Sequence, residues 1–322
     1  MPSVKFKEYK QLNGQTKTQF SMVGQGRILR RFDKTPFPVK ETDVVCPHFV
    51  LLAWANGCMY NCAWCYLKGT FRFYGQKPNG RVPMVFKSRE RMAKALKAFV
   101  SVKDLEPELI NTGELSDSLM DEGHVHGEPF SESLIKFFED TQHKILFLTK
   151  STSVQSFLRN SWQDHAVLSW SVNAVPVAER WEKLAPPVKA RLDAAQKVYD
   201  AGYEVRLRID PMVPIVDWKK HYGHLVDMIY ERLKPSRVTL GCLRGLTSTI
   251  LHCNDKSWIR YLTEKSNWGR KPPFEQRLEM YEHVIERLDG QGLTNYALCK
   301  DTVAMWKALN LNRHKVKCNC VL

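Results

Sequence analysis

The sequence predicts an α/β fold: a partial (βα)6 barrel of the TIM type, followed by a C-terminal extension that carries cysteines. The alternation of two kinds of segment predicts this fold. Short apolar runs alternate with amphipathic stretches, and repeated βα units of this kind build a parallel sheet. The apolar runs cover residues 49–55, 108–113, 144–150, 166–173, 204–214 and 237–243, and the amphipathic stretches between them include 87–101, 131–141, 188–201 and 218–233.

The segment PPVKARLDAAQKVYDAGYEVRLRID (186–210) shows one such unit. Prolines open a predicted helix, apolar residues recur at helical spacing, Gly202 ends the helix and a β-branched strand follows. Parallel sheets carry their functional groups at the carboxyl ends of the strands. In this chain the predicted strand ends carry Cys58, Glu114, Lys150, Asn173, Asp210 and Cys242.

The chain divides into three predicted regions. Residues 1–45 form a basic N-terminal extension that wraps the domain or contacts a partner, residues 46–243 form the barrel core, and residues 244–322 form a region that binds substrate or DNA. Within the last region we expect a helix over 274–289, a short strand over 294–299 and a cysteine-bearing tail.

The composition favours a globular protein with a polyanionic partner. Hydrophobic residues make up 43% of the 322 residues, and 48 Lys and Arg against 34 Asp and Glu give a net charge of +14. This excess favours nucleic acid, above all at SNWGRK (266–271), where a tryptophan stands among basic residues. Because the sequence has no run of 18 apolar residues and no apolar leader, we expect a cytoplasmic monomer without a membrane span.

Three cysteines lie close together in the loop CMYNCAWCY (58–66), directly after the first apolar run. Cys58, Cys62 and Cys65 have C-x3-C-x2-C spacing. A structural zinc site usually needs four protein ligands, commonly in two C-x2-C pairs. Three thiolates can instead hold three irons of a [4Fe–4S] cluster and leave the fourth iron open. The spacing favours the cluster, with a zinc site completed by a distant fourth ligand as the alternative.

The loop resembles the cluster motif of the radical S-adenosylmethionine superfamily. Further segments, LFLTK (146–150), SWSVN (169–173), DAAQKVYDAGYEVRLRIDPMVP (193–214) and SNWGR (266–270), resemble in order the spore photoproduct lyase family. The resemblance covers about residues 49–270. It implies a barrel of the radical S-adenosylmethionine type, a [4Fe–4S] cluster on the three cysteines, S-adenosylmethionine at the open iron, and a 5′-deoxyadenosyl radical that abstracts a substrate hydrogen.

The same resemblance implies which residues bind the cofactor. Tyr66 would lie near the adenine, Glu114 of a GE motif would bind the ammonium group, and Lys150 would meet the carboxylate. Ser171 and Asn173 would contact the ribose or the methionyl part. Each of these side chains also fits a simpler role at a strand end, where it satisfies backbone groups.

Other residues would face the substrate by the same resemblance. Ser116 and Asp117 follow Glu114 closely, and Arg244, Trp268 and Arg270 match the lesion-binding segment. There an arginine would grip a phosphate and the tryptophan would stack where a base is everted. A tryptophan packed in the core is the alternative. Asp210 precedes a proline at a strand end and is interpreted as structural.

Two positions depart from the repair enzymes of this family. Those enzymes have a cysteine that returns a hydrogen atom to the product radical, and Glu114 occupies that place here. A carboxylate cannot donate a hydrogen atom as a thiol can. Trp64 stands just before the third cluster cysteine, where the family often has a tyrosine. Both substitutions weigh against simple repair of thymine dimers.

The remaining cysteines include a group near the C-terminus. We expect Cys242, Cys299, Cys318 and Cys320 to meet around a second [4Fe–4S] cluster, with a zinc site as the main alternative and free thiols as the third. Cys46 and Cys253 have no partner at ligand spacing and are interpreted as packing residues.

These features predict a radical enzyme that abstracts hydrogen from a thymine-derived base in DNA. The departures favour rearrangement, an isomerisation of a hypermodified thymine such as bacteriophages make, over lyase-type repair of thymine dimers. Radical chemistry on a peptide or small metabolite, and a zinc-containing nucleic-acid-binding protein, are the alternatives. The expected partners are DNA or a thymine nucleotide, and an electron donor such as flavodoxin or ferredoxin.

Overall fold

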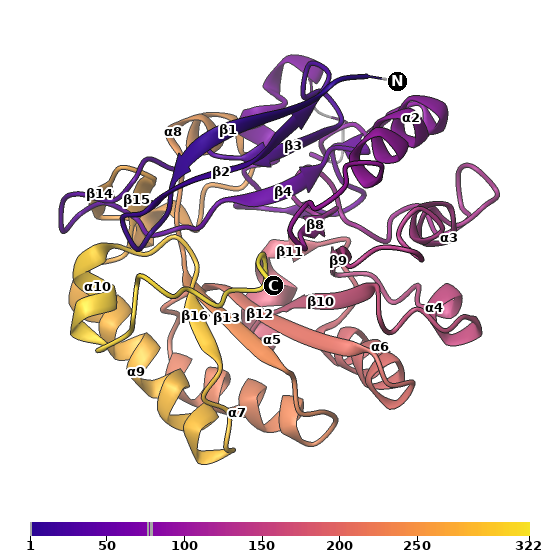
Figure 1. Cartoon of the computed structure of the whole chain (residues 1–322). Helices are drawn as coiled ribbons and strands as arrows, with labels where there is room; N and C mark the ends of the chain where they lie inside the picture. The colour runs from indigo at the N-terminus through magenta and orange to yellow at the C-terminus, as the bar shows by residue number, and fades with distance from the viewer. Residues whose placement is uncertain (1, 76, 78–79) are drawn as a thin grey trace.

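A curved ten-stranded sheet organises the molecule (Figure 1). The structure is a computed structural model and describes residues 2–75, 77 and 80–322. The strand order is β1-β2-β3-β4-β8-β9-β10-β12-β13-β16. The parallel part consists of β4 (Phe49–Leu52), β8 (Leu109–Asn111), β9 (Lys144–Thr149), β10 (Ala166–Val172), β12 (Glu204–Met212), β13 (Arg237–Cys242) and β16 (Tyr296–Leu298).

Helices cover the outer side of this sheet (Figure 1). The parallel strands β4, β8, β9, β10, β12 and β13 are almost wholly buried, as expected for parallel strands that are covered on both faces. The principal helices are α2 (Arg89–Val100), α3 (Phe130–Ile135), α4 (Gln155–Arg159), α5 (Val175–Trp181), α6 (Val188–Asp200), α7 (Trp218–Tyr230) and α9 (Phe274–Gly290). The predicted α/β class is therefore confirmed.

The sheet remains an open arc, because its edge strands β1 and β16 do not pair with each other in the described part of the chain. The strand expected near residues 294–299 is β16, which extends the parallel series beyond the six predicted units. The shorter elements are α1 (Leu67–Thr70), η1 (Arg72–Tyr74), β5 (Ala55–Asn56), β6 (Asn61–Cys62), β7 (Val85–Phe86), β11 (Glu182–Lys183), α8 (Thr247–His252), η2 (Ile259–Tyr261), β14 (Glu264–Ser266), β15 (Gly269–Lys271) and α10 (Val303–Ala308).

Helix α6 shows how the sequence sets the element boundaries. Pro187 stands at its N-cap, where a missing backbone N–H costs nothing. Leu192, Ala195 and Val198 recur at helical spacing and are buried against the sheet. Gly202 follows with φ of +85°, a left-handed conformation that glycine adopts without strain and that ends the helix.

The N-terminal extension forms three antiparallel strands that continue the sheet. They are β1 (Val4–Lys10), β2 (Thr16–Val23) and β3 (Leu29–Phe32), and β3 pairs with β4. The sequence showed only weak periodicity here because β1 is an edge strand with one buried side chain among seven residues.

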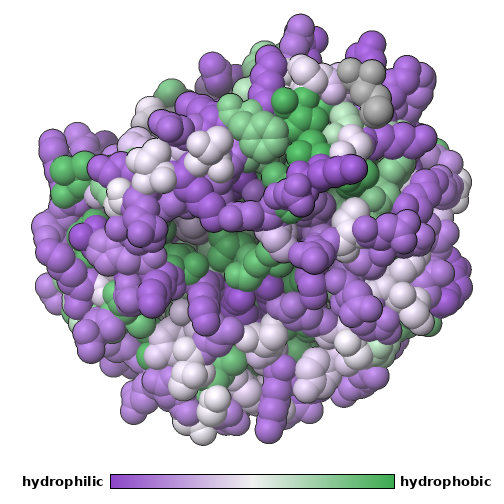
Figure 2. Space-filling view, viewed as in Figure 1, coloured by the Kyte–Doolittle hydropathy of each residue, from purple (hydrophilic) through white to green (hydrophobic). Residues whose placement is uncertain are grey.

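The face seen in Figure 2 is mostly hydrophilic. No helix in the described residues is long and apolar enough to span a membrane.

The C-terminal tail fills the inner side of the arc, and the C-terminus lies near its centre (Figure 1). Buried Asn319 donates to Ser169 Oγ at 2.7 Å and to the Leu207 carbonyl oxygen at 2.9 Å, while its own Oδ1 accepts from Thr239 Oγ1 at 2.8 Å. Arg206 and Arg237 donate to backbone carbonyl oxygens of the same tail. The tail therefore satisfies polar groups that the strands direct inward.

Replacing Asn319 tests this role. Asn319→Ala should lower the free energy of unfolding by about 1–3 kcal/mol, because buried polar partners lose their hydrogen bonds. Asn312→Ala is the matched control, since Asn312 is exposed, and it should change stability by less than about 0.5 kcal/mol. Urea unfolding would measure both. Equal effects of the two substitutions would show that the tail is not a structural part of the arc.

Candidate active site

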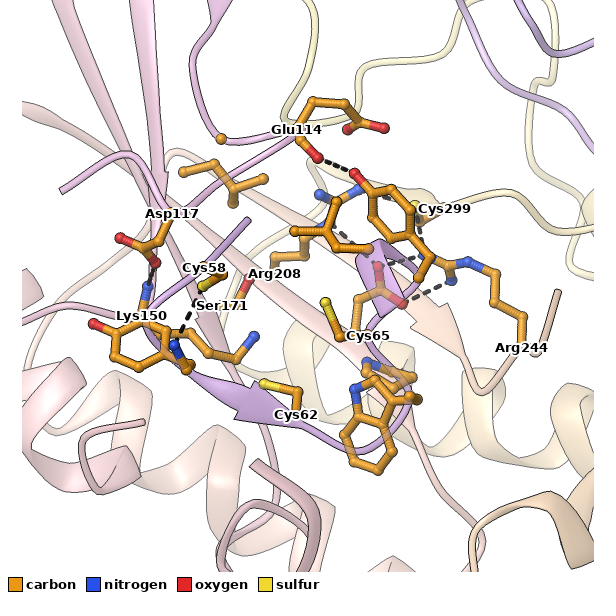
Figure 3. Close-up of a pocket in the computed structure, with 18 of the residues that line it drawn as sticks. Cys58, Cys62, Cys65, Glu114, Asp117, Lys150, Ser171, Arg208, Arg244 and Cys299 are labelled. Atoms are coloured by element: carbon orange, nitrogen blue, oxygen red, sulfur yellow. Dashed lines mark hydrogen bonds and ion pairs between the residues drawn. The ribbon is translucent and has the colours of Figure 1, made fainter. Parts of the chain in front are cut away.

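A cavity of about 250 Å³ lies at the carboxyl ends of the parallel strands (Figure 3). Its walls come from the loop after β4, the segment after β8, the ends of β9, β10 and β12, and residues 299–300 after β16. This is the edge at which parallel α/β sheets carry their functional groups. Side chains far apart in the sequence therefore face one space.

The three cysteines of the loop line this cavity, and Figure 3 shows their sulfurs turned toward a common space. The loop is fixed by short-range pairing. β6 pairs with β11 in the register Cys62 to Glu182, and the Cys65 backbone N–H donates to the Cys62 carbonyl oxygen at 3.2 Å. The predicted positions of Cys58, Cys62 and Cys65 on one cavity wall thus agree with the structure.

The environment keeps these thiols protonated in the absence of metal. Burial raises the pKa of all three, that of Cys62 to about 12, although Lys150 opposes the shift at Cys62. A bound metal would replace the thiol protons, so its affinity would fall with decreasing pH.

The donor set fits a cluster better than a single ion. In the described part of the chain, no group of three or more His, Cys, Asp or Glu side chains is arranged to hold one metal ion. A [4Fe–4S] cluster does not require such convergence, because each thiolate binds a different iron. Three thiols around a shared space can each bind one iron of such a cluster.

Lys150 is held at the cavity by a chain of charged groups. Asp117 accepts from the Lys150 backbone N–H at 2.7 Å and from Thr149 Oγ1 at 2.6 Å. Lys150 Nζ lies 3.7 Å from Glu182 Oε1, and Glu182 Oε2 pairs with Arg191 Nη1 at 2.5 Å. Burial lowers the pKa of Lys150, but Glu182 and Cys62 outweigh it, and the net pKa is raised. Lys150 is therefore a fixed cation beside the three thiols.

Glu114 supplies a carboxylate on another wall of the cavity (Figure 3). The Tyr66 hydroxyl donates to the Glu114 backbone carbonyl oxygen, which joins this segment to the cysteine loop. Burial raises the pKa of Glu114, and Lys300 and Arg208 oppose that shift. Ser116 also lines the cavity and donates to the Thr112 carbonyl oxygen at 3.4 Å.

Two arginines and an aspartate form the wall near β12 and β13. Arg244 donates to both oxygens of Asp210, each at 2.8 Å, and Arg208 Nε lies 3.4 Å from Asp210 Oδ2. Although burial alone would raise it, these arginines lower the pKa of Asp210 to about 2. Gly241 makes room for the pair, since a Cβ there would lie 2.4 Å from Asp210 Oδ1. Asp210 thus joins two arginines in this wall and also lines the cavity, and its structural role stays a prediction.

Trp268 lines the cavity and is only partly buried, so the core-packing alternative is wrong. Lys300 Nζ lies 3.8 Å from the centre of its ring, a cation–π contact. The β14–β15 hairpin that carries Trp268 also places Arg270 on the exposed surface, outside the cavity lining. An aromatic ring in the cavity and an exposed cation outside it are therefore two positions apart in the sequence.

Two predicted site residues are not where the sequence suggested. Asn173 is fully buried: its Nδ2 donates to the Pro211 carbonyl oxygen at 2.8 Å and its Oδ1 accepts from Tyr222 at 2.9 Å. It is absent from the cavity lining, and its hydrogen bonds connect β12 with α7. Ser171 does line the cavity, as expected.

Cys242 is the second correction. Thr239 and Gly241 face the inner side of β13, so the alternation of a strand turns Cys242 toward α9. Its backbone N–H donates to the Tyr281 hydroxyl at 2.9 Å. The structure therefore does not bring Cys242 together with the tail cysteines.

Sequence reasoning missed Arg208, Lys300 and Glu182. Arg208 lies in the strand EVRLRID, whose alternation indicates which face of the sheet its side chain occupies. The sequence does not indicate the partners of that side chain. Lys300 adopts φ of +50°, an uncommon conformation for a non-glycine residue. No local sequence pattern predicted its place in the cavity wall. Glu182 follows a helix and reaches the site only through the pairing of β11 with β6.

The fold and the three-cysteine loop define a protein of the radical S-adenosylmethionine superfamily. The sequence model of the family described as "Spore photoproduct lyase" matches residues 47–243, which is more than half of the chain. The chain belongs to the spore photoproduct lyase family.

Similar proteins agree with this membership. The spore photoproduct lyase of Bacillus subtilis (strain 168) is 25% identical over 178 residues, 55% of this chain and 50% of that protein. That of Geobacillus sp. (strain Y412MC61) is 26% identical over 181 residues, 56% of this chain and 50% of that protein. The chain thus spans about half the length of the curated relatives it matches.

Solved structures show the same fold. A spore photoproduct lyase complexed with dinucleoside spore photoproduct superposes with a TM-score of 0.63 at 19% identity, over 77% of this chain and 75% of that chain. A mutant with bound AdoMet and dinucleoside spore photoproduct gives a TM-score of 0.62 at 18% identity, over 78% and 76%.

The Asp210 ion pairs are testable. Asp210→Asn should lower the free energy of unfolding by about 3–5 kcal/mol, because it leaves buried arginines unpaired. The contribution is present above the ordinary aspartate pKa and should be lost as the pH falls through about 2.

Asp193→Asn is the matched control, since Asp193 pairs with Lys189 and Arg232 at a side-chain exposure of 39%. It should cost about 1 kcal/mol or less. Urea unfolding at neutral pH measures both variants, and a smaller loss for Asp210→Asn than for the control would contradict the buried network.

Proposed function

We propose that this chain is a radical S-adenosylmethionine enzyme that acts on a thymine-derived base in DNA, and that it reverses a lesion of the spore-photoproduct type. One observation carries the proposal. The segment that matches the family, 47–243, contains the three-cysteine loop, Glu114, Lys150 and Asp210, and these face a single cavity. The related proteins are named spore photoproduct lyases, and two similar structures hold dinucleoside spore photoproduct.

The comparisons favour repair over the isomerisation that the sequence alone suggested. The names of the relatives and the contents of their structures concern the spore photoproduct, and nothing among them concerns a hypermodified thymine. The earlier preference depended on Glu114 and on the tail cysteines. Neither feature identifies a modified base as substrate.

In this proposal the cavity residues hold the cofactors. Cys58, Cys62 and Cys65 bind a [4Fe–4S] cluster, and the opposite charges of Glu114 and Lys150 bind the amino and carboxylate groups of S-adenosylmethionine. When bound, this pair of cofactors supplies a carbon-centred radical that abstracts a hydrogen atom from the substrate. A flavodoxin- or ferredoxin-like protein is the proposed electron donor.

The protein's own contribution is orientation and exclusion of water. Asp117 fixes the backbone of Lys150 while Glu182 holds its ammonium group, so the cation does not need to reorganise when the cofactor binds. Tyr66 ties the Glu114 segment to the cysteine loop, which keeps the anionic and the thiol walls in register. Pre-arranged groups of this kind reduce the cost of binding.

The substrate would enter beside Trp268. Its partly exposed ring offers a stacking surface for an everted base, and Lys300 above the ring strengthens the contact with an anionic substrate. Arg270 on the outer surface of the same hairpin is placed to contact a phosphate. The net charge of +14 supports a polyanionic partner.

A second reaction is favoured by one residue. Glu114 stands where the repair enzymes of the family have a hydrogen-donating cysteine, and a carboxylate cannot replace a thiol in that step. A rearrangement needs no such donor, because 5′-deoxyadenosine can return the hydrogen that was taken. Isomerisation of a hypermodified thymine is therefore the alternative proposal.

Anaerobic turnover decides between the two. We expect the wild type, with reductant and S-adenosylmethionine, to form 5′-deoxyadenosine and to restore thymine in DNA that carries spore photoproduct. Cys58→Ala should abolish both, whereas Cys253→Ala, a buried cysteine outside the cavity lining, should retain them. Mass spectrometry of the released nucleosides gives the readout.

Two outcomes would contradict the proposal. Full 5′-deoxyadenosine formation by Cys58→Ala would exclude the cluster assignment. Turnover only of DNA with an amino-acid-modified thymine, with substrate deuterium appearing in both 5′-deoxyadenosine and product, would replace repair by rearrangement.

DNA binding gives an independent test of the hairpin. Arg270→Ala should flatten the slope of log affinity against log salt by about one unit if Arg270 contacts a phosphate. Trp268→Ala should leave the slope unchanged and weaken binding by about 1–3 kcal/mol if the ring stacks on a base. Lys189→Ala, an exposed lysine on the outer helix α6, is the control and should change neither quantity. Binding that does not depend on salt would contradict a DNA substrate.

A further inference from the structure

A group of buried thiols lies next to the reaction cavity but outside the three-cysteine loop. Cys299 follows β16 and lines the cavity itself, and the tail residues Cys318 and Cys320 lie on the inner side of the arc. The exposed fractions of these three residues are 9%, 7% and 7%. The proposed function uses none of them.

Cys46 joins this group through backbone pairing. Val44 forms an antiparallel bridge with Thr302, and the Val45 N–H donates to the Asp301 carbonyl oxygen at 2.8 Å. The same antiparallel direction carries Cys46 to the level of Lys300, one residue from Cys299. The Cys46 thiol accordingly lies within electrostatic reach of both Cys299 and Cys320. The sequence gave this cysteine no partner, because the residues it meets are more than 250 positions away.

The two tail cysteines close the group. The Cys318 and Cys320 thiols lie close enough to interact electrostatically, and Cys318 is also within electrostatic reach of Cys46 and Cys299. Asn319 between them is anchored in the strands, and Arg237 Nη1 donates to the Cys318 carbonyl oxygen at 2.8 Å. Their position is therefore built by the fold and does not depend on a mobile end.

The neighbours of these sulfurs are hydrogen-bond donors and cations. Arg208 Nη2 donates to Cys299 Sγ at 2.9 Å and Arg244 Nη2 donates to it at 3.5 Å. Asn111 Nδ2 donates to Cys320 Sγ at 3.7 Å, and Lys300 lies beside Cys46. N–H groups directed at sulfur, with cations nearby, are the surroundings that stabilise metal-bound thiolates.

We propose that Cys46, Cys299, Cys318 and Cys320 bind a thiophilic metal centre, and that this centre is an iron–sulfur cluster. Four cysteines are a complete ligand set for such a cluster. Zinc also binds four thiolates, but they must converge on one point at about 2.3 Å. Among the described residues no such convergence exists, whereas a cluster distributes its four thiolates over separate irons.

The proposal replaces the ligand set expected from the sequence, with Cys46 in place of Cys242. It also gives the tail a second anchor, since a metal held by Cys318 and Cys320 would tie the C-terminus to the segments after β3 and β16. Binding of a preformed cluster would displace the thiol protons and would change no oxidation state. The inference concerns metal content and does not rest on the proposed function.

Metal analysis of the full chain tests the site. The protein is reconstituted anaerobically with iron and sulfide, and iron, sulfide and zinc per chain are measured together with the electron paramagnetic resonance spectrum. The wild type should bind about eight irons, as two [4Fe–4S] clusters. A variant with Cys58→Ala, Cys62→Ala and Cys65→Ala should keep about four of them, because only the second centre remains.

Substitutions in that triple variant identify the ligands. Cys46→Ser, or Cys318→Ser with Cys320→Ser, should remove the remaining iron. Cys242→Ser and Cys253→Ser are the matched controls, since both residues are buried cysteines outside the group, and both should retain it. Circular dichroism of each variant shows whether it is folded, and only folded variants are compared.

Three results would overturn the proposal. No iron in the triple variant would exclude a second cluster. Iron lost with Cys242→Ser but kept with Cys46→Ser would reject this ligand set. One zinc per chain that disappears with Cys46→Ser, without a second portion of iron, would assign the four thiols to zinc and reject the cluster.

Discussion

The inner face of an open arc of strands must be filled, and this constraint governs the structure. Parallel strands covered by helices outside still direct every second side chain inward, and here those side chains include Ser169 and Thr239. Asn319 pairs with both, and Arg206 and Arg237 satisfy the tail's own carbonyl oxygens. Because buried polar groups without partners are costly, the tail is required for the arc as much as the helices are.

The cavity is the part of this interior that the tail leaves open. The charged side chains in two of its walls are paired with opposite charges. Asp210 lies between Arg208 and Arg244, and Glu182 lies between Lys150 and Arg191. A buried ion pair of this kind adds little net stability, because desolvation opposes the Coulomb attraction. What it adds is fixed geometry. Each network holds one wall of the cavity and leaves Glu114 and the three thiols facing the open space.

The sequence predicted the elements where their periodicity was strong. The run 166–173 became β10, and 188–201 became α6, within one residue at each end. The three-cysteine loop was readable because its ligands are adjacent in sequence and need only a short turn. The exposed edge strand β1 was not recognised, since a strand with one buried side chain has almost no apolar alternation.

The positions of Asn173 and Cys242 differ from those expected, and both differences have the same cause. Asn173 and Lys150 both stand at strand ends, but the Tyr222 hydroxyl of α7, 49 positions away, donates to the Asn173 side-chain oxygen Oδ1. Cys242 and Cys299 both end strands, but the pleat turns one outward and leaves the other in the cavity. Such outcomes depend on which face a strand presents and on long-range pairing. The spacing of residues along the local sequence indicates neither of them.

The predicted replacement of a donor thiol by Glu114 raises the question of whether Cys299, which also lines the cavity, acts as hydrogen donor. Its surroundings argue against that role. Arg208 and Arg244 both direct N–H groups at its sulfur, so the sulfur acts as an acceptor. If Cys299 binds the proposed metal centre, its thiol proton is displaced and it has no S–H hydrogen to give. The same surroundings suit a metal ligand. Under the proposed four-thiol centre, Cys299 is a metal ligand, and a repair reaction would draw its returning hydrogen from another group.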